Sequence, residues 1–84
     1  MQYNSSVFPM TQMQPGIRAR VKALNCSGSI RRRLQDIGLI EGTPIRLLFR
    51  RSSKSLGAYS IRGATIALRP SESDQILVTK EETP

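Results

Sequence analysis

Side chains that could perform acid–base or nucleophilic chemistry are few in this sequence. It contains no histidine and one cysteine, Cys26. General acid–base and covalent catalysis both need a titratable group or a nucleophile with a supporting partner. We therefore expect no enzymatic activity, and we interpret Cys26 as a small buried hydrophobe.

The sequence also contains few side chains that could bind a metal ion. The acidic side chains are scattered, apart from the pair Glu72 and Asp74 and the pair Glu81 and Glu82. Clusters of histidine and thiolate ligands are what usually hold transition metals tightly, and the composition offers none. We expect no metal site and no cofactor.

Positively charged side chains are concentrated in one part of this sequence. Residues 17–54 carry ten lysines and arginines against two acidic residues, Asp36 and Glu41, and three of the arginines are consecutive at 31–33. Such an excess attracts an anionic partner, which charge alone does not resolve into nucleic acid, anionic lipid or acidic protein. The simpler alternative for the three consecutive arginines is a solvated helix surface that binds no partner. Arginine forks bind carboxylates in two places at once, which favours docking on a protein.

The arginine run falls within a predicted short helix. Ile30, Leu34 and Ile37 recur at spacings of four and three, which places them on one buried side. The opposite side then turns toward water and presents the side chains Arg31, Arg32 and Gln35.

Both ends of this helix have sequence signals. Ser29 is predicted to cap its start, because a serine oxygen can accept bonds from the first free backbone amides. Gly38 is predicted to end it in the left-handed conformation and to let Leu39 fold back over the last turn.

Alternating apolar and polar residues predict strands near 17–23, 45–50, 59–62, 65–69 and 76–78. In the second strand Phe49 is expected to face inward, and Arg46 and Arg50 outward. Gly16, Gly42 and Gly63 are interpreted as turn residues. Residues 51–57 form an exposed loop and residues 70–74 a turn.

Five short strands with one inserted helix predict a mainly β fold, a small, partly closed five-stranded barrel over residues 13–80. Residues 1–12 are predicted to be a flexible tail whose last part packs through Phe8 or Met13, and residues 81–84 a second flexible tail. No apolar run approaches the about 20 residues that span a bilayer, and no secretory signal is visible, so we expect a cytoplasmic location.

Several stretches together resemble the ferrous iron transport protein A (FeoA) family. They are Pro15-Gly16 with Ala19 and Val21, Arg31-Arg32-Arg33-Leu34 with Asp36, Gly38-Leu39, Gly42-Thr43 and Ile45, then Ala58-Tyr59, Ile61-Arg62-Gly63 and Ile66-Ala67-Leu68-Arg69. The resemblance implies an SH3-like barrel with a short inserted helix. It also implies an accessory role in bacterial ferrous iron uptake beside FeoB, the membrane transporter with a cytosolic GTP-binding part.

Under this hypothesis the protein binds FeoB and is recruited by it to the inner face of the membrane, without inserting into the lipid. The predicted partner-binding residues come from the helix and from the outward positions of the second strand. They are Arg31, Arg32, Gln35, Leu39, Arg46 and Arg50.

Two other functions stay open. The first is a basic barrel that binds nucleic acid by stacking bases on aromatic side chains, but Phe49 and Tyr59 are both predicted to be buried, which argues against it. The second is a self-associating module, a monomer or weak homo-oligomer, in which the outward residues Leu48 and Leu77 make the contact.

Overall fold

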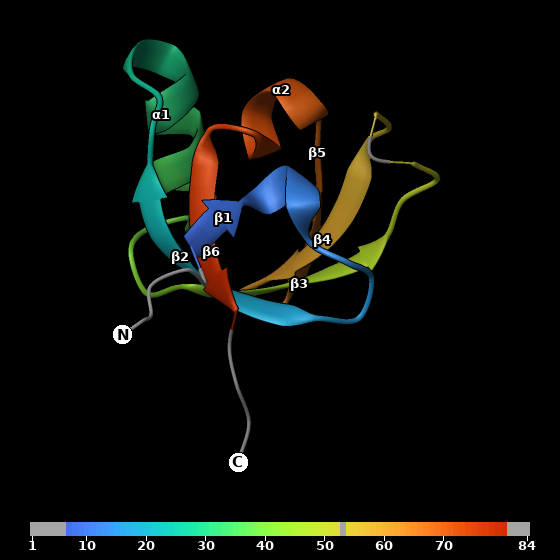
Figure 1. Cartoon of the computed structure of the whole chain (residues 1–84). Helices are drawn as coiled ribbons and strands as arrows, with labels where there is room; N and C mark the ends of the chain where they lie inside the picture. Colours follow the sequence, from blue (N-terminus) through green and yellow to red (C-terminus); the bar gives the residue numbers. More distant parts are fainter. Residues whose placement is uncertain (1–6, 53, 81–84) are drawn as a thin grey trace.

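A computed structural model describes residues 7–52 and 54–80 of the chain. The described part is mainly β and contains six strands, two short α-helices and one turn of 3-10 helix (Figure 1). In chain order the elements are β1 (Val7–Pro9), η1 (Met10–Gln12), β2 (Arg18–Leu24), α1 (Gly28–Asp36), β3 (Pro44–Phe49), β4 (Gly57–Ile61), β5 (Ala64–Leu68), α2 (Pro70–Ser73) and β6 (Ile76–Lys80). Of the two predicted tails, residues 1–6 and 81–84 lie outside the described residues.

All six strands join one antiparallel sheet in the order β1-β6-β2-β3-β4-β5. Within the described residues β1 and β5 each pair with one strand only, so the sheet is curled but not closed (Figure 1). The predicted five-stranded barrel is therefore wrong in its strand count. The sixth strand is β1, which pairs with β6 from Val7 opposite Thr79 to Pro9 opposite Leu77. Three residues are too few to show an alternating pattern in sequence.

The alternating residues of β2 face the core and the solvent in turn, as predicted. Ala19 and Val21 are buried, whereas Arg18, Arg20 and Lys22 between and beside them are exposed. Successive side chains of a strand point to opposite faces of the sheet, so one face of β2 lines the core and the other carries positive charge.

Strand β3 follows the same pattern until its last residues. Ile45 and Leu47 are buried, but the pairing with β4 shifts register between Leu47 and Phe49. An extra residue in one strand reverses the face that the following side chain occupies. Phe49 is consequently 63% exposed, and the prediction that it faces inward is wrong.

Helix α1 begins at Gly28, and its cap lies two residues before the predicted one. The N-cap is Ser27, with no capping bond from its side chain, and Ser29 is an exposed residue of the first turn. Leu34 is fully buried and Ile37 partly buried, as the spacing predicts. Ile30 is 40% exposed instead, because the first turn of α1 extends past the ends of the neighbouring strands (Figure 1).

The turn at the end of α1 is fixed by two backbone hydrogen bonds. Gly38 has φ +99° and donates from its backbone nitrogen to the Gln35 carbonyl at 3.0 Å, while the Leu39 nitrogen donates to the Leu34 carbonyl at 3.0 Å. These paired bonds form a Schellman cap, in which the chain reverses through a left-handed residue. Leu39 thereby enters the core with no exposed surface, which confirms the predicted fold-back.

Buried Thr43 holds this turn against β3. Its Oγ1 donates to the Gly38 carbonyl at 2.8 Å and accepts from the Ile40 nitrogen at 3.2 Å.

The predicted turn glycines Gly16, Gly42 and Gly63 also have positive φ. A further difference is that residues 70–73 form α2, whose Glu72 carboxylate accepts from the Arg69 nitrogen at 3.0 Å.

One apolar cluster fills the space inside the curled sheet. Met10 and Met13, from the segment around η1, are 0% and 1% exposed and belong to it, and Phe8 packs against it. In the described part, every buried side-chain nitrogen and oxygen has a hydrogen-bond partner. None of the helices in residues 7–52 and 54–80 has the length and apolar character needed to span a membrane.

Leu34 provides the first prediction, since it is the side chain that docks α1 on the core. We expect Leu34→Ala to lower the free energy of unfolding by about 2–5 kcal/mol, because the cavity cannot fully collapse. Ile30→Ala removes a similar side chain from the exposed part of the same helix and is expected to change it by less than about 1 kcal/mol. Urea titration followed by circular dichroism measures both; equal losses would contradict the packing described.

Candidate functional site

The six predicted partner-binding residues do not form one surface. The structure places Arg31, Arg32 and Gln35 on α1 and Arg46 on the outward face of the sheet. Leu39 is buried in the core, and Arg50 is hydrogen-bonded to a backbone carbonyl. The basic residues therefore separate into two surfaces, which we describe in turn.

The first surface is the exposed side of α1. Arg31, Arg32 and Gln35 line a shallow depression there, together with Gly28 and Ser29 at the start of the helix. We call the set Arg31, Arg32 and Gln35 the helix face. All three residues are exposed, as the helical spacing predicts.

The arginines around the helix face differ in how they are held. Arg31 donates from Nη1 to the Leu24 carbonyl at 2.9 Å and to the Cys26 carbonyl at 3.4 Å, so it ties α1 to the end of β2. Arg33 forms an ion pair with Glu72 of α2, whose side chain is 16% exposed. Arg32 has no such partner among the described residues. The residue of this run with the greatest freedom to meet a ligand is therefore Arg32.

Two predicted site residues have internal roles. Leu39 lies in the core with no exposed surface, so the prediction that it contacts a partner is wrong. Arg50 is only partly exposed and donates from Nη2 to the Met13 carbonyl at 2.7 Å, across 37 residues of sequence. It therefore anchors the segment that leads into β2.

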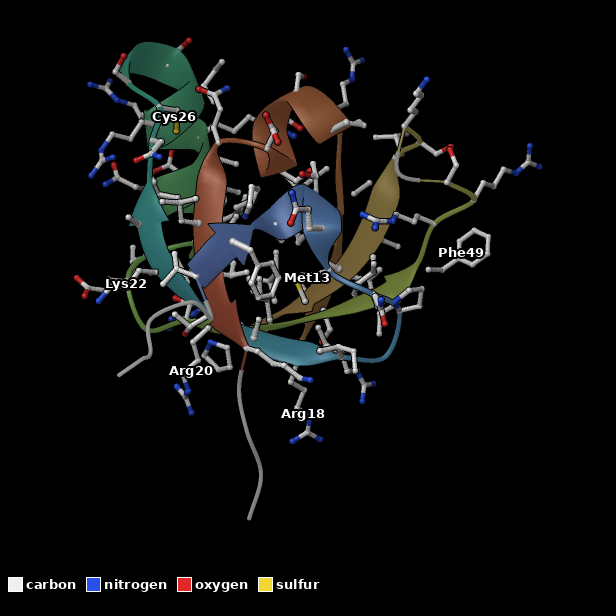
Figure 2. All side chains as sticks on the ribbon, viewed as in Figure 1. Met13, Arg18, Arg20, Lys22, Cys26 and Phe49 are labelled. Atoms are coloured by element: carbon white, nitrogen blue, oxygen red, sulfur yellow. The ribbon has the colours of Figure 1, made fainter. Side chains whose placement is uncertain are left out.

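The second surface lies on the outward side of β2, β3 and β4. Arg46 lines a shallow depression there with Arg18, Arg20 and Arg62, and with Ser60 and Pro44 beside them. We call the set Arg18, Arg20, Arg46 and Arg62 the arginine face. Arg18 and Arg20 project from β2 away from the sheet interior (Figure 2).

Sequence reasoning did not identify three residues of the arginine face. The alternation in β2 and β3 predicts that Arg18, Arg20 and Arg46 point outward, but pairing and register decide that they meet. In the observed register Arg18 lies opposite Arg46. Arg62 falls at the end of the strand predicted near 59–62, but it lies in the turn between β4 and β5, and its place on this face depends on that turn.

Neither surface, in the described part of the chain, contains a cluster of metal-ligating side chains. Within residues 7–52 and 54–80, no group of three histidine, cysteine, aspartate or glutamate side chains is close enough to hold a metal ion. Cys26 is 8% exposed and packs in the core cluster, as its sequence context predicts. What the two surfaces can do chemically is bind anionic groups by charge-assisted hydrogen bonds.

Comparison with known proteins identifies the family. Residues 8–80 match the model of the FeoA domain. A comparison with curated protein sequences found no match. The resemblance inferred from the sequence motifs is thus confirmed over nearly the whole chain.

Solved structures agree with this match. The FeoA protein from Chlorobium tepidum is 25% identical with a TM-score of 0.79, over 87% of this chain and 70% of that one. Iron(II) transport protein A from Clostridium thermocellum is 27% identical with a TM-score of 0.82, over 87% of this chain and 45% of that one. The zinc complex of Stenotrophomonas maltophilia FeoA, described as a prokaryotic SH3 domain protein, shares the fold at 20% identity and a TM-score of 0.78, over 88% of this chain and 95% of that one.

The different bonding of Arg31 and Arg32 yields a second prediction. Arg31→Ala removes two bonds to backbone carbonyls and is expected to lower the free energy of unfolding by about 1 kcal/mol. Arg32→Ala should change it by less than about 0.5 kcal/mol, because this exposed side chain has no bond to lose within the described chain. Thermal unfolding of both variants checks the assignment. Equal stability of the two variants would show that the Arg31 bonds do not hold the helix.

Proposed function

The chain belongs to the FeoA family, and we propose that it is a small accessory protein of bacterial ferrous iron uptake that binds the cytosolic GTP-binding part of a FeoB-type transporter. It works in the cytoplasm, is recruited to the membrane by this partner, and modulates transport by binding. The family assignment to ferrous iron transport supports the pathway. The Stenotrophomonas maltophilia relative has been put forward as a ferrous iron transport activating factor, which supports an effect on transport.

The observation that carries the proposal is the composition of the exposed side of α1. Arg32 and Gln35 project into solvent, and Ile30 adds an apolar side chain that is 40% exposed on the same helix. Protein interfaces combine apolar contacts that lose water with polar groups that set orientation. A short helix that offers both is a suitable docking element.

Charge complementarity indicates the kind of surface that α1 meets. The helix contains three arginines and one acidic residue, Asp36, at its last position. Arginine is favoured at interfaces because its planar fork can bind a carboxylate through two parallel bonds. We therefore infer that the partner presents carboxylates around a small apolar patch.

The residues that line a neighbouring groove add to this argument. Ile30 and Arg33 line a shallow groove with Leu56 of the β3–β4 loop, which is 56% exposed. Two large apolar side chains thus flank the Arg33–Glu72 ion pair. Exposed apolar residues grouped in this way indicate a protein contact more than a solvated surface.

The third prediction tests this docking directly. Arg32→Glu is expected to weaken binding to the partner transporter at least about ten-fold, because reversal replaces attraction with repulsion at a close contact. Arg51→Glu makes the same charge change at an exposed site of the β3–β4 loop and should weaken binding less than about three-fold. Titration calorimetry against the transporter from the same genome, in a non-ionic detergent without lipid, measures both affinities.

Ile30→Ala supplies an independent check on the apolar part of this contact. It is expected to weaken binding about five-fold and to change the free energy of unfolding by less than about 1 kcal/mol, since the side chain is 40% exposed in the free protein and loses water in the complex. Wild-type affinity in both Arg32→Glu and Ile30→Ala would exclude α1 as the docking element. Absence of any binding by the wild-type protein would exclude the partner itself.

A further inference from the structure

The arginine face has an unusual composition for an exposed sheet. The outward positions of β2, β3 and β4 include no acidic residue and one aromatic residue, Phe49, which lies opposite Ala58 after the register shift. The other outward residues are Arg18, Arg20, Lys22, Pro44, Arg46, Leu48, Ala58 and Ser60. The nearest acidic residue along the chain is Glu41, in the turn before β3. Positive charge on this face is therefore not balanced by residues of its own strands.

The register of the sheet brings like charges together. Arg18 lies directly opposite Arg46, and Arg46 lies opposite Ser60. Directly opposed like charges destabilise an antiparallel pair, whereas an opposite charge at either position would stabilise it. Neither Arg18 nor Arg46 has an ion-pair partner among the described residues. An external anion would relieve this repulsion.

Arg62 completes the face from a strained position. Its backbone has φ +51°, a region that a side-chain-bearing residue rarely adopts. Its aliphatic stem lies across Gly38, so closely that a Cβ at Gly38 would clash with Cδ of Arg62. The stem is thus held in place by the end of α1, and the guanidinium lines the same depression as Arg18, Arg20 and Arg46.

We propose that the arginine face binds the anionic surface of a lipid bilayer through headgroup phosphates. The face has a single exposed aromatic side chain, Phe49, and not the row of aromatic platforms that holds single-stranded nucleic acid. No residue of a helix lines its depression, so no helix is placed there to enter the groove of a duplex. Its large apolar side chains are Leu48 and Phe49 at the end of β3, and neither lines the depression between the arginines, so the centre of the face lacks the apolar core of a protein interface. A broad surface of phosphates needs neither feature, because clustered arginines attract it by charge.

This contact is separate from the proposed docking of α1 and does not rest on it. The molecule measures 36 × 27 × 24 Å along its principal axes, which exceeds the screening length of about 10 Å at 0.1 M salt. Cations outside the face therefore contribute little to lipid binding at that salt. A protein that contacts lipid through the sheet could present α1 to a membrane-embedded partner.

The test is co-sedimentation of the full chain with vesicles of phosphatidylcholine alone and of phosphatidylcholine with 30 mol% phosphatidylglycerol, in 0.1 M salt. Each arginine near an anionic surface contributes about a five-fold factor in affinity. The variant R18Q/R46Q/R62Q is therefore expected to bind the anionic vesicles on the order of 100-fold more weakly. The matched variant R32Q/R51Q/K54Q removes the same charge elsewhere and should lose less than about five-fold.

Thermal unfolding separates a binding defect from a folding defect. R18Q/R46Q/R62Q should unfold at the same temperature as the wild type or higher, because the opposed charges are removed. Selective binding to the anionic vesicles, lost only in this variant, supports the proposal. Equal losses in both variants, no binding to anionic vesicles, or binding confined to a 30-nucleotide oligomer would each overturn it. None of these results depends on the transporter.

Discussion

The structure depends on burying one apolar cluster in a chain of only 84 residues. A domain of this size buries a smaller fraction of its surface than a larger one, so each core side chain matters more. The curled sheet supplies most of the cluster, and its remaining sides are covered by Leu34 and Leu39 around the end of α1 and by Met10 and Met13 from the N-terminal segment. Without these contributions the inner face of the sheet would meet water.

The same constraint explains the charged exterior. Because the apolar residues at alternate strand positions are used in the core, the opposite face of β2 and β3 is left with arginines. The core also fixes the direction of α1, since Leu34 and the turn at Gly38 hold it against the sheet. Positive charge thereby divides into the helix face and the arginine face, each suited to a different anionic partner.

The turn at Gly38 connects these two surfaces physically. On one side it closes α1 through the Schellman cap, and on the other it supports the stem of Arg62 in the arginine face. A residue with a side chain at this position would strain the backbone and displace Arg62. The helix face and the arginine face thus share one structural support, although they point to different partners.

The sequence by itself determined the features that depend on local periodicity and backbone preference: the strands from β2 onward, the buried side of α1 at Leu34, and the left-handed turn at Gly38. The tertiary structure alone decided the pairing of β1 with β6, the exposure of Phe49 after a register shift, the complete burial of Leu39, and the bond from Arg50 to the Met13 carbonyl. It also decided that Arg18, Arg46 and Arg62 meet. The physical reason is that strand register and packing arise between distant segments, and no pattern within one segment encodes which residues of another will lie beside it.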